Sequence, residues 1–89
     1  MSPYIKQDSR PQFKGIFDIF KELNVTTPGE LNYIFTGLLM LYQDNMGENY
    51  TNHNEIVGVL ECVKQEWYRK MTTPYEETKR SENGDVEVF

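Results

Sequence analysis

The sequence predicts an all-α protein, a small helical bundle of two long antiparallel helices with a leading helix and a short C-terminal helix. Three observations predict this fold class. Apolar residues recur at helical spacing over three stretches, cap-Pro-Glu start signals precede two helices, and strand-like alternation is confined to the last five residues. At 89 residues, we expect a single helical domain over 1–89.

The first expected helix covers residues 10–23 and follows an N-terminal arm, residues 1–8. Ser9 is a suitable N-cap, and Pro11 falls in the first turn, where proline is tolerated. Asn24 can end the helix. Its apolar face consists of Phe13, Ile16, Phe17, Phe20 and Leu23.

The second expected helix runs from Pro28 to about Gln43. Thr27 caps it, with Glu30 three residues on, as in a capping box. Its core face holds Leu31, Ile34, Phe35, Leu38, Leu41 and Tyr42, and a second face holds Tyr33, Gly37 and Met40. A helix that is apolar on nearly all sides needs cover from two directions, so we expect a homo-oligomer.

The third expected helix, residues 52–71, is the longest, with Asn52 as its N-cap. Its core stripe is formed by Ile56, Val59, Leu60, Val63, Trp67 and Met71. The small residues Gly58 and Cys62 lie on another ridge and allow a second backbone to come close. Two interpretations stay open: packing inside the monomer, or a contact between subunits with Arg69 at its end.

After Met71 the sequence predicts a bend, because residues before a proline tend to leave helical geometry. A short helix over 74–81 should follow at an angle and end at Asn83-Gly84. The tail, residues 82–89, is expected either to fray or to lie across a partner. The polar stretch 44–51 is expected to connect helices, because its spacing does not fit a calcium loop.

Composition and charge restrict the classes of partner that the protein can bind. A formal charge of −5 disfavours DNA, RNA and anionic membranes as partners. The N-terminus lacks the apolar core of a signal peptide, and no run is long enough to span a membrane, so we expect a cytoplasmic protein. His53 and Cys62 would lie roughly 13 Å apart along one helix, which is too far for a catalytic dyad within one chain. No catalytic set, cofactor motif or metal cluster is found, so we expect a non-enzyme without a cofactor.

The candidate ligand site combines cations with aromatic rings near the end of the third helix. Aromatic faces stack on bases, and arginine forks on phosphates. The residues proposed to line it are Asn32, Tyr33, Lys64, Tyr68, Arg69, Tyr75 and Lys79. The alternative is that these cations only complement a helix C-terminus. The candidate subunit contact comprises Tyr33, Gly37, Met40, Gly58 and Cys62.

Several segments resemble a family of small uncharacterised proteins from bacteriophages and prokaryotic genomes. They are Tyr4-Ile5-Lys6-Gln7, Leu31-Asn32-Tyr33, the run from Glu55 to Lys64 with Glu66 and Tyr68-Arg69-Lys70, Pro74-Tyr75-Glu76, Lys79, and Asn83-Gly84-Asp85-Val86. Trp67 and Lys70 vary the pattern, and Glu87-Val88-Phe89 extend beyond its expected end. The resemblance carries over no catalytic residue.

The resemblance implies a phage-borne accessory protein that counters host antiviral defence in the host cytoplasm. In its concrete form, the protein sequesters a nucleotide immune signal in pockets between subunits. The alternatives are a protein–protein inhibitor of a host defence or metabolic enzyme, and a virion assembly factor.

Overall fold

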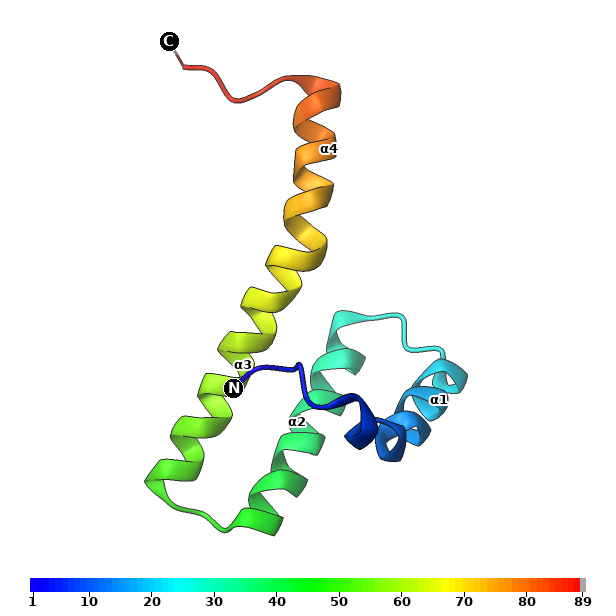
Figure 1. Ribbon diagram of the computed structural model, residues 1–89, viewed down its shortest axis with the longest axis vertical. Helices are drawn as coiled ribbons and strands as arrows, with labels where there is room; N and C mark the ends of the chain where they lie inside the picture. The colour runs from blue at the N-terminus through cyan, green and yellow to red at the C-terminus, as the bar shows by residue number, and fades with distance from the viewer. Residues whose placement is uncertain (89) are drawn as a thin grey trace. The chain divides into compact units, whose positions relative to one another are not determined.

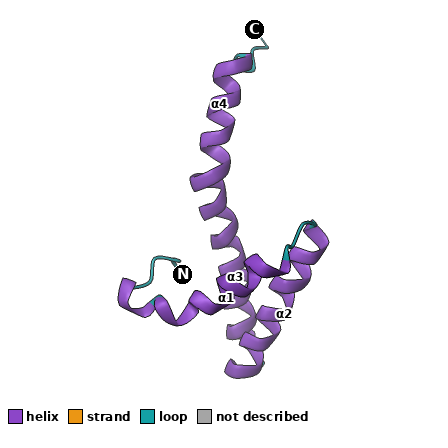
Figure 2. Ribbon diagram, turned by 90° about the vertical axis from the view of Figure 1, so that its right-hand side faces the viewer, coloured by secondary structure: helices purple, strands orange, loops and turns teal. Residues whose placement is uncertain are grey.

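The computed structural model describes residues 1–88, and all regular structure among them is helical (Figure 2). Two 3₁₀ turns, Gln7–Ser9 and Pro11–Phe13, lead into α1, Lys14–Leu23. They are followed by α2, Pro28–Met46, and α3, Tyr50–Trp67. A π-helical turn, Tyr68–Thr72, then joins α3 to α4, Thr73–Asn83 (Figure 1). The predicted all-α class is therefore confirmed.

The chain falls into two compact units, residues 2–56 and residues 57–88 together with Met1. In the first unit, α1 ends at Asn24, which takes the left-handed conformation (φ 50°, ψ 53°) that asparagine tolerates. The predicted capping box of α2 is present, since Thr27 Oγ1 accepts from the Glu30 N–H at 3.1 Å. The Glu30 carboxylate in turn accepts from the Thr27 N–H at 3.1 Å.

The turn between α2 and α3 is held by Asn52, the one buried residue in the described chain. Its Nδ2 donates to the carbonyl oxygens of Met46 at 3.1 Å and Gly47 at 2.8 Å. The prediction of Asn52 as N-cap is wrong. Asn49 Oδ1 accepts from the Asn52 N–H at 2.9 Å, because the helix begins at Tyr50, two residues earlier than predicted.

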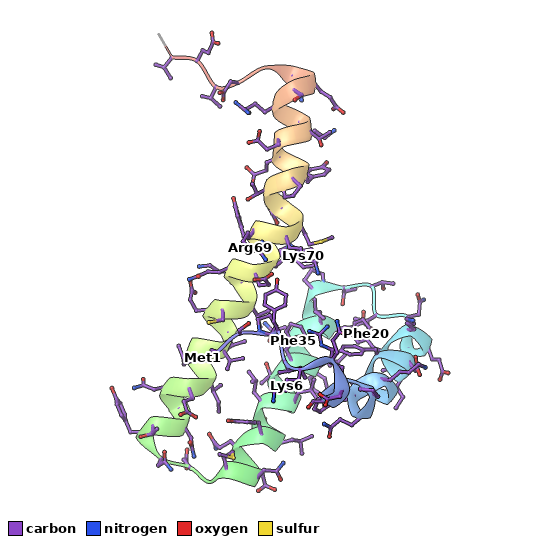
Figure 3. The ribbon with its side chains drawn as sticks, in the orientation of Figure 1. Met1, Lys6, Phe20, Phe35, Arg69 and Lys70 are labelled. Carbon is purple, nitrogen blue, oxygen red and sulfur yellow. The ribbon has the colours of Figure 1, made fainter. Side chains whose placement is uncertain are left out.

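Within residues 2–56, close backbone contacts between elements join only neighbours along the chain. Phe20 on α1 and Phe35 on α2, labelled in Figure 3, are 37% and 44% exposed. No hydrophobic side chain is buried in the described part of the chain. The helices expected from the sequence are present in the described chain, and the side chains of their expected core faces are partly exposed.

In the second unit the predicted bend before Pro74 is replaced by the π turn, which is a correction to the sequence analysis. A proline inside an α-helix removes a hydrogen bond and its ring clashes with the carbonyl four residues back. Here the Thr73 N–H instead reaches the Tyr68 carbonyl, five residues back. The wider turn lets the helix continue through Pro74 to Asn83, and Gly84 (φ 88°) ends it.

Candidate functional site

Five of the seven predicted ligand residues lie on one continuous helical segment. Lys64 belongs to α3, Tyr68 and Arg69 to the π turn, and Tyr75 and Lys79 to α4. Figure 3 labels Arg69 beside Lys70 on this segment. The other two, Asn32 and Tyr33, lie on α2 in the other unit. The basic and aromatic residues are therefore presented together by one helix, and we call residues 64–80 the basic-aromatic segment.

Carboxylates three residues away pair with the three cations among the predicted ligand residues of this segment. Lys64 lies 3.3 Å from Glu61, Lys79 lies 3.3 Å from Glu82, and Arg69 pairs with Glu66. The side chains of the three cations are between 49% and 70% exposed. Exposed pairs of this kind contribute only about 0–1 kcal/mol. A phosphate could replace these carboxylates at little cost.

The ion pair between Lys64 and Glu61 is an example of such a weak interaction. Its pKa is lowered from the ordinary value, first by a hydrogen bond from Gln65 and then by the hydrogen bond and charge of Lys64. The Gln65 Nε2 donates to the same carboxylate at 3.3 Å. Lys64 therefore shares its carboxylate partner with a neutral donor, which leaves the lysine able to exchange partners.

Tyr75 and Lys79 form a direct aromatic–cation contact. The Lys79 ammonium lies 5.6 Å from the centroid of the Tyr75 ring. A cation within about 6 Å of an aromatic face is attracted by the ring quadrupole. The Tyr75 side chain is 63% exposed, so it offers ring surface for stacking beside a positive charge.

Tyr68 is engaged across the π turn. Its hydroxyl donates to the Glu76 carboxylate, and this hydrogen bond, with the negative charge of Glu76, raises the pKa of Tyr68. Residues eight apart on a plain α-helix are offset by about 80° around the axis. The π turn holds one extra residue and removes roughly that offset, which aligns the two side chains.

On α2, the two predicted ligand residues have different surroundings. Asn32 Oδ1 accepts from the Thr36 hydroxyl at 3.0 Å. Tyr33, 81% exposed, borders a shallow pocket of about 420 Å³. The pocket's other lining residues are Leu23, Val25, Gly29, Glu30 and Ile34.

The sequence analysis missed this pocket. The signal that could have found it is the pair of apolar residues that flank Asn24, one turn away from the start of α2. The only charged residue of its lining is Glu30, whose carboxylate is occupied by the capping box, with Thr27 Oγ1 donating to it at 2.8 Å. The pocket therefore offers apolar walls rather than a site for an anion.

The predicted subunit-contact residues remain open on α2 and are partly covered on α3. Tyr33 and Met40 are 81% and 68% exposed, and a Cβ added at Gly37 would meet nothing within 4 Å. A Cβ at Gly58 would lie 2.6 Å from the Met1 Cε, so Met1 uses the space that the glycine leaves. Cys62 is a half-buried free thiol.

The described residues contain no group of three or more His, Cys, Asp or Glu side chains that could hold a metal. His53 Nε2 lies 3.0 Å from Glu48 Oε2 on the surface. Over the same residues, no helix combines the length and apolarity needed to cross a bilayer.

Comparison with known proteins gives one family. The family model described as "Domain of unknown function (DUF6899)" matches residues 1–86. Among curated proteins and solved structures, none matches the chain. The functional argument therefore depends on the chain's own residues.

Proposed function

This chain belongs to the family DUF6899, and from its own residues we propose that it acts by binding rather than catalysis. It works as an assembly of identical chains, each completing its helical bundle on its neighbours. In the host cytoplasm it holds a small anionic ligand of the nucleotide type. Its biological role is that of a phage-borne accessory protein that sequesters a nucleotide signal of antiviral defence.

The observation that supports a ligand of the nucleotide type is the position of the Lys79 ammonium, 5.6 Å from the centroid of the exposed Tyr75 ring. A nucleotide combines a base, which stacks on an aromatic face, with a phosphate, which pairs with cations. Arg69 and Lys64 supply further positive charge on the same helical segment, each in an exposed ion pair. The overall charge of −5 restricts such binding to this local segment.

The test is native mass spectrometry of the protein purified from bacterial cells with an active nucleotide-based defence. A stoichiometric added mass in the nucleotide range supports the proposal and identifies the ligand class. The Arg69→Ala and Lys79→Ala variants should lose that mass while the assembly persists, whereas Lys21→Ala and Tyr50→Ala, on α1 and at the start of α3, should keep it. An assembly without added mass, or equal loading of all four variants, would contradict the proposal.

A second candidate function, inhibition of a host enzyme by direct protein contact, is favoured by the tail. Val86 and Val88 follow the end of α4 and are 88% and 80% exposed. Exposed apolar residues on an extended segment are suited to a groove or sheet edge of another protein. If this candidate is correct, deletion of residues 85–89 removes inhibition while the assembly stays intact. If that variant still inhibits the enzyme, the tail is not the segment that binds it.

A further inference from the structure

We propose that a second copy of this chain packs on a continuous apolar stripe that runs along α3, the π turn and α4. This inference rests on the self-association included in the proposed function and is independent of its ligand. The stripe, called here the α3–α4 stripe, consists of Val59, Leu60, Val63, Trp67, Met71 and Tyr75.

The π turn makes this stripe continuous. With about 100° per residue, an uninterrupted α-helix would place Trp67 about 20° and Tyr75 about 100° away from Ile56 around the axis. The apolar residues from Val63 onward are spaced four apart, so each step adds about 40° of drift. The extra residue of the π turn, Tyr68–Thr72, reduces this rotation around the axis by roughly 100°. Tyr75 therefore lies in line with the rest of the stripe.

The stripe lacks cover although its length suits a helix–helix interface. From Val59 to Tyr75 it extends over roughly 24 Å at 1.5 Å per residue. Its six side chains are between 40% and 63% exposed. Figure 1 shows α3 passing into α4 without a break, so the stripe is presented by one continuous rod of helix.

The unit that carries the stripe supplies no second helix to cover it. Residues 57–88 consist of one continuous helix, from the later part of α3 through α4, followed by the tail, and the same unit adds only Met1. Because no hydrophobic side chain is buried in the described chain, cover is needed whenever the chain is folded. A second copy is the partner that is always present.

Charge also favours a second copy at this place. Between residues 57 and 83 there are five cations and five carboxylates, whereas the whole chain carries −5. They are Lys64, Arg69, Lys70, Lys79 and Arg80, and Glu61, Glu66, Glu76, Glu77 and Glu82. Two copies can therefore approach along this segment without the repulsion that their net charges would cause elsewhere.

Trp67 provides the readout, because it is the only tryptophan and lies on the stripe, 61% exposed. Sedimentation equilibrium and Trp67 fluorescence are measured together over a dilution series of the full chain without nucleotide. The expected result is an oligomer at high concentration with blue-shifted emission. On dilution the emission shifts to the red as the oligomer dissociates.

Two variants with the same substitution distinguish the stripe from the rest of the helix. Val63→Glu places a charge on the stripe and should raise the dissociation constant at least tenfold. Val57→Glu, 66% exposed and off the stripe, should leave it within about twofold. If Val63→Glu loses helicity when dilute, recovery of helicity at high concentration still reports association.

Three results would overturn the inference. One is a wild-type monomer at every concentration with blue-shifted emission, which would mean that the chain covers the stripe itself. Another is such a monomer with red-shifted emission, which would leave the stripe to a different protein. The third is an oligomer that Val63→Glu and Val57→Glu affect equally. None of these measurements depends on nucleotide binding, so failure of the ligand proposal is recognised separately.

Discussion

Asn52 shows how one polar side chain organises the local structure at the α2–α3 turn. Its side chain is 7% exposed and donates to two carbonyl oxygens at the end of α2. The last carbonyls of a helix have no partner within the helix, so such donors stabilise the end. Asn49 then caps the next helix through the Asn52 N–H. Asn52 therefore stabilises the end of α2, and Asn49, three residues earlier, stabilises the start of α3.

We expect Asn52→Ala to lower the free energy of unfolding by about 1–2 kcal/mol, because two hydrogen bonds to α2 are lost. Asn54→Ala is the matched control, since Asn54 is exposed on the same turn of α3 and the change in helix propensity is the same. Chemical denaturation at one fixed protein concentration measures both. Equal effects of the two substitutions would show that the Asn52 hydrogen bonds contribute nothing.

The capping box of α2 is a second residue-scale feature, and it predicts a pH dependence. The pKa of Glu30 is lowered below its ordinary value of 4.5, chiefly by the hydrogen bond from the Thr27 side chain, with further hydrogen bonds from the Thr26 and Thr27 backbone. The folded state therefore binds this proton less readily than the unfolded state. The stabilisation is present above pH 4.5 and is lost as the pH falls through the lowered pKa.

Glu30→Gln should remove this part of the acid sensitivity. Thermal melts followed by circular dichroism between pH 7 and pH 3 measure it, with Glu87→Gln in the exposed tail as the control. A steeper loss of stability in acid for Glu30→Gln than for wild type would contradict the assignment.

At the scale of the elements, the π turn has two consequences. It lets the helix continue past Pro74, and it aligns side chains that a plain α-helix would separate. The Tyr68 hydroxyl reaches Glu76, and Tyr75 joins the line of Trp67 and Met71. Because π turns are rare and are frequently found at functional sites, we connect this one to the stripe.

The element-scale prediction is that Pro74→Ala strengthens the helix and weakens self-association. Proline is about 3 kcal/mol less favourable than alanine inside a helix. Restoring the N–H lets the π turn revert to an α-helix, which rotates Tyr75 away from the stripe. We expect circular dichroism to show equal or higher helicity, and sedimentation equilibrium to show a dissociation constant raised about tenfold.

Pro28→Ala is the control for this prediction, because Pro28 occupies the first turn of α2, where proline is tolerated. It should leave association unchanged. Tighter association of Pro74→Ala than of wild type would show that the π turn opposes the contact between copies.

At the scale of the whole molecule, the balance between apolar surface and net charge decides how strongly copies of the chain associate. The described residues bury a single polar side chain and leave large apolar side chains exposed on every long helix. The chain also carries −5, so copies repel each other at long range. Association is then a competition between burial of apolar surface and repulsion that salt can screen.

Salt should therefore act in opposite directions on the two proposed interactions. Raising NaCl from 20 to 200 mM shortens the screening length from roughly 20 Å to about 7 Å. Self-association should tighten about two- to fivefold, whereas binding of the copurified nucleotide should weaken. Sedimentation equilibrium and isothermal titration calorimetry measure the two constants. Weaker self-association at high salt would mean that ion pairs, rather than the apolar stripe, hold the copies together.

The candidate site was predictable in its residue types and only partly in its arrangement. Tyr75 and Lys79 are four residues apart on a helix, and that spacing alone predicts their contact. Glu61 and Glu66, the carboxylate partners of Lys64 and Arg69, follow from the same rule, since each lies three residues from its cation. Whether Asn32 and Tyr33 join them depends on contacts far apart in sequence, which periodicity does not specify.

By itself, the sequence determined the helices, three of their ends and the all-α class, because capping, proline and hydrophobic spacing act over three to five residues. Thr27, Asn24 and Gly84 were each identified correctly for this reason. The predicted start of the first helix after Ser9 is wrong, since α1 begins at Lys14, and α2 runs to Met46 rather than Gln43. The structure showed two local features that the sequence pattern left undecided: Asn49 rather than Asn52 caps α3, and Pro74 widens a turn rather than ending the helix. Only the tertiary structure decided that the stripe assigned to the core stays exposed, because cover for a helix face comes from residues distant in sequence or from another chain.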